Sequence, residues 1–94
     1  MNLHFNKTII LKLKHKHKVM PSEVEECFYN RNKGLLEDTR EEHQTRPPTL
    51  WFISETDHGR ILKVVFIELQ NGRYEIKTAY EPNEIEVTIY EKYA

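Results

Sequence analysis

The stretch "RILKVVFIELQNGRYEIKTAYE" (residues 60–81) decides the fold. It contains two runs rich in Val, Ile, Phe and Tyr, residue types that favour strands. Asn71-Gly72 separates the two runs. Asn-Gly is typical of a type I′ turn, because both central residues of that turn need a positive φ. We therefore predict a β-hairpin with one strand on each side of Asn71-Gly72.

The residues before this hairpin extend the predicted sheet. "TLWFISET" (49–56) is a third β-rich run, and "DHG" (57–59) separates it from the hairpin. "GLLED" (34–38) is a possible fourth, shorter strand, and the polar stretch 39–48 that follows it ends in two prolines. The pattern predicts an antiparallel meander of three to four strands.

Helical patterns flank the predicted sheet. "PSEVEECF" (21–28) has proline at its first position and acids in its first turn, which suits the positive end of a helix dipole. In "EPNEIEVTIYEKYA" (81–94), Ile85, Ile89 and Tyr93 recur every four residues, although "EIEVTIY" also alternates with period two. We predict one α+β domain over residues 1–94, with N-terminal helices and a C-terminal helix on one face of a twisted sheet.

Charge is unevenly distributed although the net charge is only −1. Residues 7–18 contain five lysines and no acid, whereas residues 81–91 contain four glutamates. Such a basic element can bind a polyanion locally without a basic isoelectric point. Cys27 is the single cysteine, no apolar run is long enough to span a membrane, and the N-terminus lacks a signal-peptide pattern. We therefore expect a cytoplasmic protein without a membrane span.

The segment "LKLKHKHKV" (11–19) is compatible with two structures. As a strand, it would place His15 and His17 on one face about 7 Å apart, where they could bind a metal. As a helix it would separate them, because successive residues turn by 100°. Alternation favours the strand, whereas helix propensity and Asn6 as an N-cap favour the helix. These residues alone do not decide between the two.

Five motifs in a fixed order resemble the BrnT-like toxins of bacterial type II toxin–antitoxin pairs, over about residues 5–93. They are "KHKV" (16–19), "PSEVEECF" (21–28), "EDTREEH" (37–43), "ETDHGRILKVVF" (55–66) and "YEIKTAYE" (74–81). The resemblance implies a RelE-like fold, a helix over 7–17, ribonuclease activity, and a neighbouring DNA-binding antitoxin as partner. One position departs from the family: Tyr80 stands where the family has an arginine.

Metal-independent RNA cleavage needs a base for the 2′-hydroxyl proton, cations for the phosphate charge, and an acid for the leaving oxygen. The resemblance places His17 at the family histidine, as base or acid, and a histidine that only fills the helix end is the alternative. Lys16 beside it could contact phosphate. Arg40 and His43 are three residues apart and could converge if their loop makes a turn. For Lys16, Arg40 and His43, a solvated polar side chain is the competing interpretation.

The run "RYEIKTAYE" alternates, so Lys77 is expected on the open face of the sheet, with Lys63 facing the same way. Tyr74, Ile76, Thr78 and Tyr80 would share the packed face. We therefore count Lys77 and Tyr80 as candidate catalytic residues, Tyr80 by its position in the motif. Lys63 and Arg60 are candidate RNA-binding residues, although a solvated face would look the same. No cofactor is expected, and no metal, because a helix at 7–17 leaves the histidines without paired ligand spacing.

We expect a toxin that cuts RNA by general acid–base chemistry, with RNA as substrate, a DNA-binding antitoxin as partner, and a possible homo-oligomer. The alternative is a non-enzymatic interaction module of the same fold with a degenerate site. Tyr80 in place of the family arginine and the near-neutral charge favour that alternative. A third possibility is an enzyme acting on ADP-ribose or a nucleotide.

Overall fold

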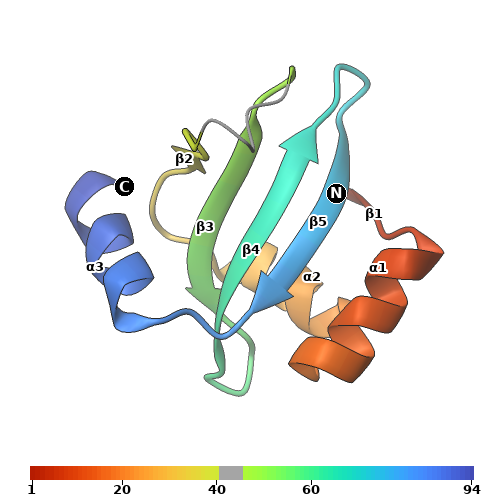
Figure 1. Ribbon diagram of the computed structural model, residues 1–94, viewed down its shortest axis with the longest axis horizontal. Coiled ribbons are helices and arrows are strands. Elements are labelled where there is room, and N and C mark those ends of the chain that lie inside the picture. Colours follow the sequence, from red (N-terminus) through yellow and green to blue (C-terminus); the bar gives the residue numbers. More distant parts are fainter. Residues whose placement is uncertain (41–45) are drawn as a thin grey trace.

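The computed structural model describes residues 1–40 and 46–94, and its centre is a five-stranded sheet (Figure 1). The strand order is β1-β5-β4-β3-β2. The strands are β1 (Asn2–His4), β2 (Leu36–Glu37), β3 (Thr49–Glu55), β4 (Ile61–Glu68) and β5 (Arg73–Tyr80). β2 to β5 form the predicted antiparallel meander, with "GLLED" supplying its short edge strand. The α+β class is therefore confirmed.

β1 makes the sheet mixed rather than wholly antiparallel, which corrects the predicted three- to four-stranded sheet. It pairs in parallel with β5, with Asn2 opposite Arg73 and His4 opposite Glu75. Three residues are too few for alternation to stand out in a sequence. β1 covers only the first part of the β5 edge. The rest of that edge contacts the short helix η1 (Leu13–His17) instead.

The N-terminal helix over residues 7–17 is confirmed, and the alternative of a strand is wrong. α1 (Lys7–Lys12) begins at Asn6, whose side chain accepts a hydrogen bond of 2.8 Å from the Ile9 amide. It continues into η1 as a π-helix, in which Leu13 is fully buried. The lysines are exposed around this helix, as an apolar stripe packed against a sheet requires.

α2 (Pro21–Asn30) and α3 (Glu84–Tyr93) lie on opposite faces of the sheet, so the expectation that all helices share one face is wrong. The ring of Phe28 in α2 lies 4.8 Å from that of Phe52, whereas Tyr90 in α3 lies 5.7 Å from Trp51. Neighbouring residues of a strand point to opposite faces. We call the two sides the α2 face, which carries Phe52, and the α3 face, which carries Trp51.

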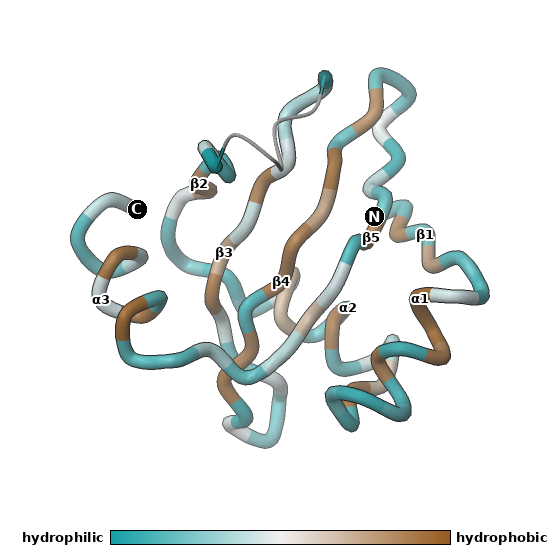
Figure 2. The backbone as a smooth tube through the Cα atoms, viewed as in Figure 1, coloured by the Kyte–Doolittle hydropathy of each residue, from teal (hydrophilic) through white to brown (hydrophobic). Residues whose placement is uncertain are grey.

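The hydrophobic core lies between α2, η1 and the sheet. The fully buried side chains include Phe52, Phe66, Leu62, Ile76 and Val64 from the strands, and Leu13, Val24 and Cys27 from the helices. Phe28 packs edge-on against Phe52 and Phe66, a favourable geometry for aromatic rings. Figure 2 shows the apolar stretches of β3 and β4 running through the centre of the molecule. Among the described helices, none combines the length and apolar character needed to cross a membrane.

The hairpin between β4 and β5 is confirmed, but its turn is not of type I′. Within this turn only Gly72 has a positive φ, of 80°, and the Gly72 amide donates to the Leu69 carbonyl oxygen at 3.0 Å. A turn followed by one glycine in the left-handed region satisfies the twist of a hairpin with a longer loop. Sequence reasoning thus located the hairpin but assigned the wrong turn.

A β-bulge in β5 changes the faces that alternation predicts. Ile76 pairs with Phe66 and Thr78 pairs with Val65, so Lys77 is an extra residue without a partner on β4. The bulge shifts the later residues by one position. Tyr80 therefore lies opposite Lys63 on the α3 face, not on the packed face with Ile76. This shift brings Tyr80 into the candidate site.

Candidate functional site

Lys63, Tyr80 and Glu86 form a hydrogen-bonded cluster on the α3 face. The Lys63 ammonium donates to Glu86 Oε2 at 2.7 Å, and the Tyr80 hydroxyl donates to the same oxygen at 2.6 Å. β4 supplies the lysine, β5 the tyrosine and the first turn of α3 the glutamate. The Lys63 side chain is 11% exposed, so this ion pair is largely shielded from water.

Trp51 forms the floor of this cluster. The Lys63 ammonium lies 4.3 Å from the centroid of the indole ring, a cation–π geometry. A pocket of about 570 Å³ opens beside Trp51, between the segment Leu36–Arg40 and α3, with Ile89 and Tyr93 on its helical wall. The cluster thus adjoins a cavity with both aromatic and charged walls.

His17 meets the cluster through Tyr80. The imidazole lies at the end of η1, and its centroid is 5.5 Å from that of the Tyr80 ring, at an interplanar angle of 33°. Partial burial lowers the pKa of His17 below its ordinary value, and the positive charges of Lys12 and Lys16 lower it further. The neutral imidazole therefore predominates near pH 7, as a general base requires.

The pKa values of the cluster keep Glu86 charged and Tyr80 protonated. Burial and the hydrogen bond to Glu86 raise the pKa of Tyr80 well above its ordinary range. Burial acts to raise the pKa of Glu86 as well, but the hydrogen bonds from Lys63 and Tyr80 outweigh it and hold that pKa below the usual value. The Tyr80 hydroxyl therefore donates a hydrogen bond to Glu86 and keeps its proton at neutral pH.

Arg40 and Asp38 form an ion pair whose charges act on Tyr80. The Arg40 guanidinium donates to both carboxylate oxygens of Asp38, at 3.1 and 2.9 Å. Asp38 is anchored in turn, because its backbone amide donates to the Thr49 carbonyl oxygen at 2.8 Å. The charge of Arg40 acts to lower the pKa of Tyr80, which places the guanidinium within electrostatic reach of the cluster. The predicted site residue His43 lies outside the described residues.

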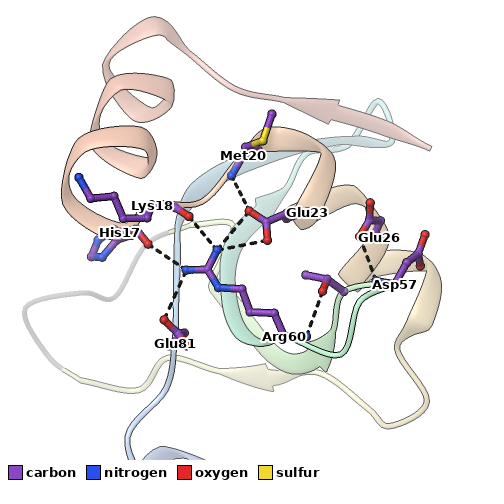
Figure 3. A network of polar contacts seen from close by, with 9 residues as sticks. His17, Lys18, Met20, Glu23, Glu26, Asp57, Arg60 and Glu81 are labelled. Carbon is purple, nitrogen blue, oxygen red and sulfur yellow. Dashed lines mark hydrogen bonds and ion pairs between the residues drawn. The ribbon is translucent and has the colours of Figure 1, made fainter.

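Arg60 is engaged in a separate network (Figure 3). Its guanidinium donates to the carbonyl oxygens of His17 and Lys18, at 3.1 and 2.7 Å, and to the Glu23 carboxylate at 3.2 Å. A further ion pair joins it to Glu81 at 3.4 Å. The side chain is only 25% exposed. Arg60 thus binds the protein itself, at the place where we had expected an RNA-binding residue.

The remaining predicted site residues differ in accessibility. Lys16 is exposed and lies close enough to His17 to lower its pKa. Lys77 is exposed at the bulge, and in the described part of the chain no hydrogen bond or ion pair joins it to the cluster. Lys63 lies on the α3 face but is buried and paired, not on an open surface. The structure therefore brings together His17, Tyr80, Lys63 and Arg40, and leaves Lys77 apart.

Sequence reasoning did not find Glu86 and Trp51 as members of the cluster. Asn83 and Glu86 form a capping box, in which Glu86 Oε1 accepts from the Asn83 amide at 3.0 Å. The N-x-x-E spacing signals a helix start. Nothing in that spacing indicates that the other carboxylate oxygen reaches Lys63. Within residues 1–40 and 46–94 there is no group of three or more His, Cys, Asp or Glu side chains that could hold a metal ion.

Comparisons with protein-family models, with curated proteins and with solved structures find no match for this chain.

Proposed function

We propose that the protein is a ribonuclease that cuts RNA by metal-independent acid–base chemistry, as the toxin of a type II toxin–antitoxin pair with a RelE-like fold. One observation carries the proposal: a histidine with a lowered pKa lies against Tyr80, within a cluster that also contains cationic side chains. The motif order that resembles the BrnT-like toxins supports the same assignment.

His17 is the base in the proposed reaction. Its neutral imidazole takes the 2′-hydroxyl proton, and the 2′-oxygen attacks the adjacent phosphorus. The bond from phosphorus to the 5′-oxygen breaks, which gives a 2′,3′-cyclic phosphate on one product, and the leaving 5′-oxygen takes a proton from water to give a 5′-hydroxyl on the other. Lys16 acts electrostatically on His17 and Arg40 on Tyr80, and both side chains reach solvent, so they would neutralise the developing charge. Arg40 would then supply the positive charge that the BrnT-like toxins supply with the arginine at the position of Tyr80. Tyr80 fixes one side of the imidazole.

RNA cleavage by the purified protein in EDTA tests this proposal. We expect a short RNA to be cut to a product with a 2′,3′-cyclic phosphate, and the 2′-deoxy analogue to remain intact. His17→Ala should lower the rate by about 10²- to 10⁴-fold, the usual contribution of a general base. His58→Ala is the matched control, because His58 is an exposed histidine in the turn between β3 and β4. Absence of cleavage, or equal cleavage by His17→Ala, would refute the proposal.

A cytoplasmic antitoxin that binds DNA is the proposed partner. The exposed lysines of α1 and η1 offer a basic surface to an acidic segment of that partner. Induced expression of this chain alone should arrest growth and degrade RNA, and co-expression of the neighbouring gene product should relieve both effects. Normal growth with folded protein present would argue against a toxin.

A non-enzymatic interaction module of the same fold is the second candidate, favoured by a specific observation. Lys63 and Tyr80 both bind Glu86, so neither is available to a phosphate without rearrangement. This candidate predicts an RNA that is bound but never cut, or a complex with the partner that survives His17→Ala unchanged. Mass spectrometry of the RNA after incubation separates the two candidates.

A further inference from the structure

Arg60 is bound by three segments that are distant in the sequence. It stands immediately before β4 and contacts the end of η1, the first turn of α2 through Glu23, and the residue after β5, Glu81 (Figure 3). Its own backbone is fixed too, because the Arg60 amide donates to the Thr56 hydroxyl at 3.1 Å. Hydrogen bonds therefore fix both the backbone of Arg60 and its guanidinium.

The end of η1 requires such a contact. A helix leaves its last carbonyl oxygens without intrahelical donors. η1 ends where Lys18 adopts a left-handed conformation, with φ of 57°, and the Val19 amide then donates back to the Leu13 oxygen at 2.9 Å. The backbone carbonyl oxygens of His17 and Lys18 instead accept hydrogen bonds from the Arg60 guanidinium. A cation at this end also interacts favourably with the helix dipole.

The carboxylates of Glu23 and Glu81 hold the guanidinium in this position. Burial acts to lower the pKa of Arg60, but the hydrogen bonds and charges of the two carboxylates outweigh it and raise the pKa, so the side chain is always charged. Glu23 is itself held, because its Oε1 accepts from the Met20 amide at 3.0 Å. A planar guanidinium can serve two carbonyl oxygens and two carboxylates at once, which an ammonium cannot do with the same geometry.

We propose that Arg60 is a positioning residue that fixes the backbone of His17 and thereby holds the imidazole against Tyr80. The proposal rests on the proposed function only in giving His17 a chemical role, because the position of the imidazole can be measured without RNA. It assigns Arg60 to the end of η1, in place of the RNA contact that its sequence position suggested. π-Helical turns occur frequently at functional sites, and here the rare turn ends at His17.

Nuclear magnetic resonance on Arg60→Gln tests the positioning directly. The His17 signal is identified by its loss in His17→Ala. We expect Arg60→Gln to abolish the contact between the His17 and Tyr80 rings and to raise the His17 pKa toward its ordinary 6.5, because the freed imidazole becomes solvated. Arg60→Lys keeps the positive charge but loses the planar guanidinium that binds several acceptors at once. It should therefore preserve the contact between the His17 and Tyr80 rings only in part.

Glu26→Gln is the matched control for a general loss of stability. Glu26 also joins α2 to the β3–β4 hairpin, since its Oε1 accepts from the Asp57 amide at 2.9 Å, but it does not touch η1 (Figure 3). It should lower the melting temperature without changing the ring contact or the His17 pKa. If Arg60→Gln does not fold, Glu23→Gln is measured instead, and it should shift both readouts in the same direction by less. An unaltered His17 pKa and Tyr80 contact in the folded variant would overturn the proposal.

Cleavage kinetics separate this inference from the proposed function. We expect Arg60→Gln to lower kcat by about 10²-fold at nearly unchanged KM, the loss that follows when a reacting group is misplaced by an ångström. A raised KM at unchanged kcat would instead identify Arg60 as an RNA contact and contradict the positioning role. If the unmodified protein cuts no RNA, the proposed function fails, and the resonance measurement still decides whether Arg60 positions His17.

Discussion

At the scale of single residues, His17 shows how surroundings set a protonation state. Partial burial and the charges of Lys12 and Lys16 all favour the neutral form. Because the folded-state pKa lies below 6.5, the neutral histidine contributes stability that is complete above pH 6.5 and is lost as the pH falls through the folded-state pKa.

The rate of RNA cleavage should therefore have an acid limb with a midpoint below 6.5. Lys16→Gln removes one of the like charges and should move this midpoint upward, toward the ordinary value. A pH–rate profile of the two proteins, together with a titration of the His17 resonance, measures the shift. Lys92→Gln in α3 should leave the profile unchanged, and a midpoint at or above 6.5 in the unmodified protein would contradict the assignment.

Most contacts within the site could not be predicted from individual residues of the sequence. His17 and Tyr80 were found through the motif resemblance, but their mutual contact depends on a bulge at Lys77 that reverses the face of Tyr80. A bulge adds one residue without any marked composition, so alternation alone predicted the wrong face. Trp51 carried no pattern, because its role depends on which side chain lies opposite it.

At the scale of elements, Glu86 supplies the polar link between α3 and the sheet, beside the packing of Tyr90 on Trp51. Glu86 closes the capping box with one oxygen and binds Lys63 and Tyr80 with the other. The start of the helix and its docking on the α3 face therefore depend on the same carboxylate. Its lowered pKa means that this link contributes stability above about pH 4.5 and loses it as the pH falls through the folded-state pKa.

Glu86→Gln should lower the free energy of unfolding by about 3 kcal/mol, because it leaves the shielded Lys63 ammonium without its counter-charge. Lys63→Met combined with Glu86→Gln should recover much of this loss, since no buried charge then remains unpaired. Urea denaturation measures both. Glu84→Gln, in the exposed first turn of the same helix, should cost less than about 0.5 kcal/mol. A loss in Glu86→Gln no greater than in Glu84→Gln would refute the coupling.

The elements themselves were more predictable from the sequence than their contacts. The hairpin followed from Asn71-Gly72, and α3 followed from Pro82 and the recurrence of isoleucine every four residues, against a competing alternation. Residues 11–17 were ambiguous because alternating lysines imitate a strand. Burial of Leu13 and the cap at Asn6 favour the helix in the folded chain, and only the cap is local in sequence. β1 is defined by its partner strand, so its own residues gave no signal.

At the scale of the whole molecule, the two faces of the sheet have different contents. The α2 face is an aromatic and aliphatic core, whereas the α3 face carries the charged cluster and its pocket. Cys27 lies entirely within the core, and burial, with the nearby carboxylates of Glu26 and Glu23 adding to it, raises the pKa of its thiol to about 12. A buried protonated thiol is inert toward alkylation.

Cys27 should therefore react with iodoacetamide only when the whole domain opens. Labelling followed by mass spectrometry should be slow in native buffer and rapid above the urea midpoint, and its rate should follow the stability of each variant. Phe52→Ala, which removes a fully buried ring beside α2, should cost about 3 to 5 kcal/mol and accelerate labelling in native buffer. Rapid labelling of the unmodified folded protein would show that the core opens locally around the thiol.

The parallel pairing of β1 with β5 has a consequence for biosynthesis. The ribosome releases Asn2 to His4 before their partners Arg73 to Glu75, which emerge only after α1 with η1, α2 and the strands β2, β3 and β4. Pairings between such distant segments form late and slowly. The edge of the sheet beside β5 therefore cannot close while translation of the preceding elements is under way. The contact of His17 with Tyr80 must wait for the same moment, and the nascent polypeptide lacks the completed cluster until β5 and the first turn of α3, with Glu86, have left the exit tunnel.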